Sequence, residues 1–134
     1  GPFETALVEG ELLVRVRVPD PPAGRRSGYA RFTPQSEADY PTVGVAARLD
    51  LDGETVRGLV LGLGGVAGRP LLVEPSALIG RPAGPDLFEA AAEAAVAACD
   101  PISDQRGSAA YKRAMVRLWA VRALTGLGDS VSNE

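Results

Sequence analysis

Residues 42–63 read TVGVAARLDLDGETVRGLVLGL, and this stretch decides the fold. Apolar residues occupy every second position from Val43 to Leu51, which predicts a half-buried strand over Thr42–Leu51. Asp52-Gly53 follows, and it indicates a two-residue hairpin turn because both residues tolerate positive φ. The alternation resumes in the next segment, so a second strand is expected over Thr55–Leu63. The stretch therefore predicts an antiparallel hairpin with one apolar face.

Upstream of the hairpin, the same period of two recurs. Glu11–Val18 places four apolar residues on one face and two arginines on the other, which predicts another half-buried strand. Pro19–Gly28 is rich in proline and glycine and is expected to be a loop. A short strand over Tyr29–Thr33 is expected to end near Pro34.

Downstream, the pattern becomes helical. Leu71–Ile79 is expected to be a short helix interrupted by Pro75. Asp86–Cys99 is expected to be a helix because Asp86 and Glu89 resemble a capping box. The longest helix is expected over Ser108–Leu127. The residues of this last helix that we expect to face the sheet are Tyr111, Ala114, Met115, Leu118 and Val121.

Strands that precede helices, rather than alternating with them, favour the α+β class. We therefore expect an antiparallel sheet of about four strands, with three helices packed on one face. Residues 1–134 are expected to form a single domain that folds alone.

Composition excludes several classes of function. The 134 residues carry a net charge of −3, which argues against nucleic-acid binding. No apolar run approaches the roughly 20 residues of a membrane-spanning helix. Histidine is absent and Cys99 is the only cysteine, so we expect neither a transition-metal site nor a His-dependent triad. The single cysteine is consistent with a cytoplasmic location.

Three motifs each permit two interpretations. Gly62–Ala67 has the spacing of a dinucleotide-binding loop, but Pro70 and Pro75 leave little room for the helix that such a loop requires. We therefore favour a glycine-rich strand end. Glu37, Asp39, Asp50 and Asp52 suggest paired-carboxylate catalysis, yet Asp50 and Asp52 flank a hairpin turn, where Asp is usual. A third motif is the run of basic residues on the last helix, which could bind an anionic partner but is more typical of a solvated surface.

The stretch Asp100–Ser108 is the most distinctive. Pro101 ends the preceding helix, and Ser108 is placed to cap the next one. Asp104 and Arg106 can tie the connection together by charge-assisted hydrogen bonds. These residues alone favour an ordered helix–helix connection.

The same stretch carries a family resemblance. Asp100-Pro101, Ser103-Asp104, Arg106-Gly107-Ser108 and Tyr111-Lys112 resemble the closing signature of the FAD-binding medium subunit of carbon monoxide and xanthine dehydrogenases, that is, of molybdenum hydroxylases. Further stretches agree in the same order along the chain, namely Phe3–Leu7 with Glu11–Leu13, Asp39–Ala46, Leu63–Ala67 with Pro70, and Arg122–Leu124.

The resemblance implies four antiparallel strands followed by three helices. It implies a flavoprotein domain that covers the flavin and contacts other subunits, which carry iron–sulfur clusters and molybdenum. In that family, glycine-rich loops in two upstream FAD-binding domains hold the FAD phosphates, and no such loops are present here. We therefore expect the isolated chain to bind no cofactor. The flavin-facing segment aligns with Tyr29–Tyr40, in which Arg31 and Gln35 replace the family's usual Lys and Arg, while Asp39 is retained.

Two functions are compatible with this sequence. One is a domain of a flavoprotein subunit, in which Arg31, Gln35, Asp39 and Tyr40 face the flavin. The alternative is a free-standing descendant that binds a small molecule and catalyses a cofactor-free cyclisation or isomerisation. Its cleft would lie between the sheet and the Pro19–Gly28 loop, with Arg31, Asp39 and Tyr40 as its polar groups. Gly1-Pro2 is either native or the remnant of a cleaved tag.

Overall fold

The computed structural model describes residues 4–34 and 39–128. Four strands form one antiparallel sheet in the order β1-β2-β3-β4, which is also their order along the chain. The strands are β1 (Arg25–Phe32), β2 (Val43–Asp52), β3 (Thr55–Gly64) and β4 (Leu71–Val73). A short 3-10 helix, η1 (Ser76–Leu78), precedes two α-helices, α1 (Pro85–Ala98) and α2 (Ala109–Gly128).

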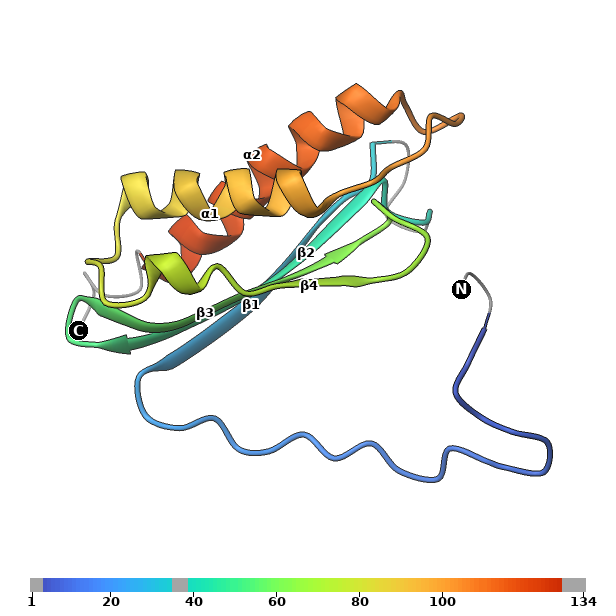
Figure 1. Ribbon diagram of the computed structural model, residues 1–134, viewed down its shortest axis with the longest axis horizontal. Helices are drawn as coiled ribbons and strands as arrows, with labels where there is room; N and C mark the ends of the chain where they lie inside the picture. The colour runs from blue at the N-terminus through green and yellow to red at the C-terminus, as the bar shows by residue number, and fades with distance from the viewer. Residues whose placement is uncertain (1–3, 35–38, 129–134) are drawn as a thin grey trace.

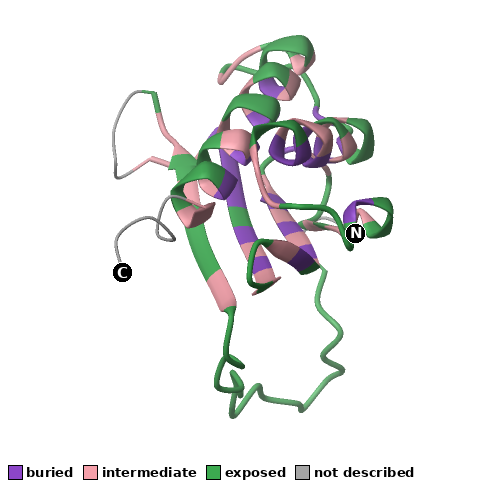
Figure 2. Ribbon diagram, turned by 90° about the vertical axis from the view of Figure 1, so that its left-hand side faces the viewer, coloured by how far each residue is buried: buried purple, intermediate pink, exposed green. Residues whose placement is uncertain are grey.

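The α+β fold and the four-stranded sheet are confirmed. The two helices lie side by side on one face of the sheet (Figure 1). The central hairpin forms, but its two-residue turn is Gly53-Glu54, one residue later than expected, because Asp52 pairs with Thr55; Gly53 has φ 58°. Because side chains alternate along a strand, β2 and β3 direct one apolar set toward the helices. Figure 2 shows this as buried bands on the sheet beneath the helices. The fully buried sheet residues include Val43, Val45, Leu49, Val56 and Leu61.

The strand expected over Glu11–Val18 is wrong. These residues form no strand in the described chain, and residues 4–24 are all exposed. The segment runs away from the sheet, on the side opposite the helices (Figure 1). An alternating pattern specifies which face of a strand is apolar. A segment becomes a strand only when a neighbouring segment pairs with it through backbone hydrogen bonds, and the pattern does not provide that neighbour. The first strand instead begins at Arg25, within the expected loop Pro19–Gly28, where the Arg25 guanidinium binds both oxygens of Asp50 at 2.7 and 2.9 Å.

The helix expected over Leu71–Ile79 is also wrong. Leu71–Val73 forms β4, which pairs with residues 61–63 of β3, and only Ser76–Leu78 is helical. The described chain therefore has two α-helices rather than three. Pro75 breaks the segment, and the pairing of β4 is a non-local interaction that local periodicity does not encode.

Helix α1 begins one residue before its expected start. Its N-cap is Gly84, without a side-chain cap, and Pro85 occupies the first turn. The capping box of Asp86 and Glu89 is therefore wrong. Pro85 explains the start, because proline has a helical φ and needs no hydrogen-bond acceptor at the first position.

Helix α2 forms where expected, but its buried face differs from the expected one. The side chains buried against the sheet and α1 are Lys112, Val116, Ala120 and Leu124. Tyr111 and Leu118 are 40% and 41% exposed, while Met115 and Val121 lie at the edge of the core. The buried face contains a lysine and an alanine, so hydrophobicity alone did not identify it. Trp119 packs against Phe32 of β1, with 5.8 Å between their ring centroids.

Candidate functional site: a cavity on the open face of the sheet

The face of the sheet away from the helices has a floor of very small residues. Opposed residues on neighbouring antiparallel strands point to the same face. Gly44 of β2 is opposite Gly64 of β3, and Ala46 is opposite Gly62. A Cβ atom added at Gly64 would meet nothing within 4 Å, and one at Gly62 would meet only Ala46, 3.5 Å from its Cβ and 4.0 Å from its carbonyl oxygen. The floor is therefore flat and open over Ala46, Gly62 and Gly64, whereas the Tyr29 ring lies over Gly44, where an added Cβ atom would be 2.7 Å from the Tyr29 hydroxyl oxygen.

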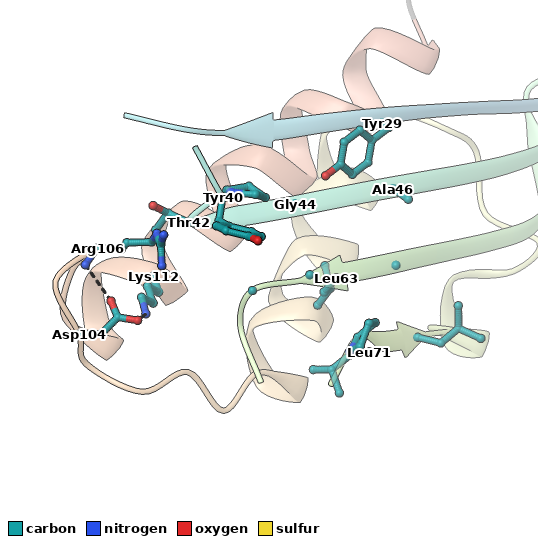
Figure 3. A pocket seen from close by; sticks show the side chains of 16 residues that line it. Tyr29, Tyr40, Thr42, Gly44, Ala46, Leu63, Leu71, Asp104, Arg106 and Lys112 are labelled. Atoms are coloured by element: carbon teal, nitrogen blue, oxygen red, sulfur yellow. Dashed lines mark hydrogen bonds and ion pairs between the residues drawn. The ribbon is translucent and has the colours of Figure 1, made fainter. Parts of the chain in front are cut away.

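This floor belongs to an open cavity of about 710 Å³ (Figure 3). Tyr29 of β1 stands on one side, and Leu71 and Leu72 of β4 stand on the other. Tyr40 and Thr42, which precede β2, line one end. Tyr40 is 79% exposed, so its ring is free to contact a ligand.

The same end of the cavity carries charged side chains. Asp104, Arg106 and Lys112 all line it. The Lys112 ammonium donates to the Asp104 carboxylate at 2.7 Å and to the Ile102 carbonyl at 2.9 Å. Lys112 is only 2% exposed, so these two acceptors satisfy a charge that would otherwise be costly to bury.

Two carboxylates at this end are held ionised. The Lys112 ammonium, followed by the Arg106 backbone N–H, lowers the pKa of Asp104 below its ordinary value. The Arg106 guanidinium, followed by the Tyr40 backbone N–H, lowers the pKa of Asp39. Both carboxylates are therefore acceptors at neutral pH, each bonded to a cation.

Unused hydrogen-bonding capacity also lies beside the cavity. The Thr42 hydroxyl oxygen and the Arg106 Nε are buried, and within the described chain neither has a hydrogen-bond partner. Thr42 is 1% exposed, and its backbone N–H donates to the Phe32 carbonyl at 2.8 Å. Buried polar atoms are usually satisfied, so this end suits a polar edge of a ligand better than an apolar one.

The arrangement fits a planar ring better than it fits a catalytic centre. A floor of glycine and alanine admits a flat ring close to the backbone, and the tyrosines can contact its edges or faces. The polar end then meets one edge of the ring. A flavin ring system has this combination of a flat apolar body and a polar pyrimidine edge, so the residues present fit it.

The four predicted site residues have different outcomes. Tyr40 lines the cavity, and Asp39 touches it through Arg106, whose Nη2 lies 3.2 Å from the Asp39 carboxylate. Arg31 is exposed on β1, opposite Gly44, and so lies on the open face without lining the cavity. Gln35 lies outside the described residues.

Sequence reasoning missed most of the cavity. The glycine floor, Thr42 and the buried Lys112 were not identified as site residues. The basic run on α2 was interpreted as a solvated surface, which holds for Arg117, paired with Glu89 and Glu93, but is wrong for Lys112. The strand register was the missing information for the floor, because it brings glycines of different strands together.

The glycine-rich motif was given two interpretations from the sequence, and the structure favours one of them. Gly62–Ala67 is followed by β4 and not by a helix, which supports a glycine-rich strand end over a nucleotide loop. Gly65 has φ 80°, and a Cβ there would lie 3.0 Å from the Thr42 carbonyl oxygen.

A groove of about 660 Å³ does lie between Val18–Pro21 and the sheet. Asp39, Tyr40 and Arg31 are not among its lining residues, so the expected polar cleft is wrong.

The connection Asp100–Ser108 is ordered as expected. The Ser108 hydroxyl accepts the Tyr111 N–H at 3.1 Å and so caps α2. Asp104 accepts the Arg106 N–H at 2.8 Å.

In the part of the chain that the structure describes, no cluster of His, Cys, Asp and Glu could hold a metal ion. No helix in the same part is long and apolar enough to cross a membrane.

Comparisons with known proteins agree with this fold. The model of the CO dehydrogenase flavoprotein C-terminal domain family matches residues 29–127. The carbon monoxide dehydrogenase medium chain of Hydrogenophaga pseudoflava is 36% identical over 126 residues, covering 92% of this chain and 44% of that protein. The nicotine 6-hydroxylase medium subunit of Paenarthrobacter nicotinovorans is 31% identical over 130 residues, covering 96% of this chain and 45% of that protein.

Solved structures give the same result. Carbon monoxide dehydrogenase from Hydrogenophaga pseudoflava superposes with a TM-score of 0.78 at 34% identity, covering 84% of this chain and 39% of that chain. This chain thus spans less than half the length of the relatives it matches. None of these comparisons supports the free-standing alternative. The chain belongs to the CO dehydrogenase flavoprotein C-terminal domain family, the C-terminal domain of the flavin-carrying subunit of molybdenum hydroxylases.

Proposed function

We propose that this domain covers the ring of a flavin with the open face of its sheet, while upstream domains of the same subunit hold the rest of the FAD. The observation that carries the proposal is the flat floor of Gly44, Ala46, Gly62 and Gly64 between the tyrosines. A larger side chain at Ala46, Gly62 or Gly64 would occupy the space of the ring, and the Tyr29 ring already lies over Gly44. The domain contributes shape and a polar edge rather than chemistry of its own.

The exposed N-terminal segment supports a partner on this side of the sheet. Half of the large apolar side chains that are exposed in the described chain lie in it, namely Leu7, Val8, Leu12, Leu13, Val14, Val16 and Val18. Burying one such side chain contributes roughly 1.5–3 kcal/mol, so a segment of this composition is stable only against a neighbour. We propose that the upstream FAD-binding domain is that neighbour. The iron–sulfur and molybdenum subunits are proposed partners of the assembled subunit, through which electrons reach the flavin.

Ring binding is tested on the isolated chain by NMR. We expect FMN at millimolar concentration to shift the backbone amide signals of Gly62, Gly64 and Tyr40. AMP, which represents the other half of FAD, should leave them unchanged. Binding should be no tighter than high micromolar, because the phosphates have no site here, and this corresponds to a binding free energy of roughly −4 to −5.5 kcal/mol. The purified chain should accordingly be colourless.

A matched pair of substitutions locates the ring. Gly64→Leu places a side chain in open space above the floor, and it should abolish the FMN shifts without a clash. Gly84→Leu also enters open space, but it lies at the start of α1, away from the cavity, so it should leave the shifts intact. FMN shifts that persist in Gly64→Leu, or that map to α1 and α2, would exclude this face as the flavin surface.

A further inference from the structure

The ring of Tyr40 has little support from its own chain segment. Tyr40 is 79% exposed and precedes β2 outside any regular element. Its backbone N–H donates to the carboxylate of its neighbour Asp39 at 2.7 Å. A side chain with this exposure would ordinarily sample several rotamers, and an aromatic wall that moves contributes little to a binding site. Its orientation therefore depends on contacts from elsewhere in the fold.

Arg106 supplies those contacts from a distant part of the chain. Its guanidinium carbon lies 5.7 Å from the centroid of the Tyr40 ring, within the range of a cation–π contact. Its Nη2 donates to the Asp39 carboxylate at 3.2 Å. One side chain thus touches both the ring and the carboxylate that binds the Tyr40 backbone.

Arg106 is itself anchored to the core. Its backbone N–H donates to one oxygen of Asp104 at 2.8 Å, and the other oxygen accepts from Lys112 at 2.7 Å. Lys112 belongs to the buried face of α2 and is the only lysine in the sequence. Figure 3 shows the three side chains together at the polar end of the cavity. The contacts form a continuous path from the helix core to the exposed ring.

We propose that Arg106 is a positioning residue that fixes the Tyr40 ring at the end of the cavity, and that Asp104 and Lys112 hold Arg106 in place. Arginine suits this role because its planar guanidinium can stack on a ring while its N–H groups bind a carboxylate, which an ammonium cannot do at the same time. The inference rests on the proposed function only for the identity of the ring ligand. The position of Tyr40 follows from the contacts themselves.

The test uses 3-fluorotyrosine and ¹⁹F NMR. The chain has three tyrosines, Tyr29, Tyr40 and Tyr111, so it gives three signals, which single Tyr→Phe variants assign. We expect Arg106→Lys, which keeps the charge, and Arg106→Gln, which removes it, both to move the Tyr40 signal toward that of the unfolded chain. Tyr29, on the other side of the cavity, is the internal reference and should not move. The backbone amide of Tyr40 should exchange about tenfold faster in both variants.

Two further variants separate positioning from general stability. Asp104→Asn does not touch Tyr40, yet it should move the Tyr40 signal in the same direction, because an amide cannot accept from both the Lys112 ammonium and the Arg106 backbone N–H with separate oxygens, and this disturbs the position of Arg106. Arg57→Lys alters a similar ion pair, with Asp52 at 2.9 Å in the hairpin, and should leave the signal unchanged. A purely structural role for Arg106 would lower the melting temperature while leaving the native Tyr40 signal in place. That result in Arg106→Lys, in Arg106→Gln or in Asp104→Asn would overturn the inference.

FMN separates this inference from the proposed function. If the ring binds, Arg106→Gln should weaken FMN binding about two- to fivefold, the effect of losing one ordered aromatic contact. If FMN shifts no signal in any variant while Tyr40 responds to Arg106, the proposed function fails and the positioning role stands. If FMN binds but Tyr40 ignores Arg106, the positioning role fails alone.

Discussion

Truncation of Leu124 is the sharpest test of how α2 packs on the sheet. Leu124 is 0% exposed on the buried face of that helix, whereas Leu118, on the same helix, is 41% exposed. Leu124→Ala removes three carbon atoms from the core, which costs about 2.5 kcal/mol in transfer free energy. The cavity left behind raises the expected loss to roughly 3–4 kcal/mol. In a domain of this size, the melting temperature should fall by about 10 °C or more.

Leu118→Ala is the matched control, because it makes the same chemical change in the same helix. Much of the Leu118 side chain already contacts water, so we expect a loss below about 1 kcal/mol. Urea unfolding of both variants, followed by the Trp119 fluorescence and by circular dichroism, gives the two free energies of unfolding. Equal losses, or a larger loss for Leu118→Ala, would refute the orientation of α2 described above.

Three further expectations concern pH, backbone conformation and the site. The Arg25 guanidinium lowers the pKa of Asp50, so this pair stabilises the fold above the unfolded Asp pKa of about 3.9, and its contribution is lost as the pH falls through the lower folded pKa. The melting temperature should therefore fall below pH 4, and by less in Asp50→Asn than in the native chain. Gly24 has φ 77°, and a Cβ there would collide with the Leu51 carbonyl oxygen, so Gly24→Ala should destabilise by more than about 1 kcal/mol in urea unfolding. Asp39→Asn should change the melting temperature by less than about 4 °C yet weaken FMN binding in the NMR titration; a large loss of stability with unchanged binding would remove Asp39 from the site.

The hairpin of β2 and β3 was predictable because its information is local. Alternation from Val43 to Leu49 specifies the strand and its buried face, and Gly53 marks the connection to within one residue, without reference to the rest of the chain. Residues 71–79 and 11–18 were mispredicted for the opposite reason. Leu71–Val73 becomes a strand because the edge of β3 is available to it, while Glu11–Val18 has the pattern of a strand but no neighbour in the described chain.

The residues of the candidate site also fall into two groups, those that the sequence predicted and those that it could not predict. Asp39 and Tyr40 were predicted as site residues from the family resemblance; Tyr40 lines the cavity, and Asp39 bonds to Arg106, which also lines it. The floor could not be predicted, because it exists only once the register places Gly44 opposite Gly64. Lys112 could not be predicted either, since a lysine in an amphipathic helix is normally assigned to its solvated side.

The burial of Lys112 has a practical consequence for the chemistry of the folded chain. Because the sequence has no other lysine, every side-chain amine of the domain is enclosed at the junction of α2 with the connection from Ile102 to Ser108. An acylating reagent can reach that amine only when this corner opens and releases Asp104. The rate of acylation at Lys112, read from the peptide that contains it and so kept apart from the α-amine, therefore measures local unfolding at one corner beside the cavity.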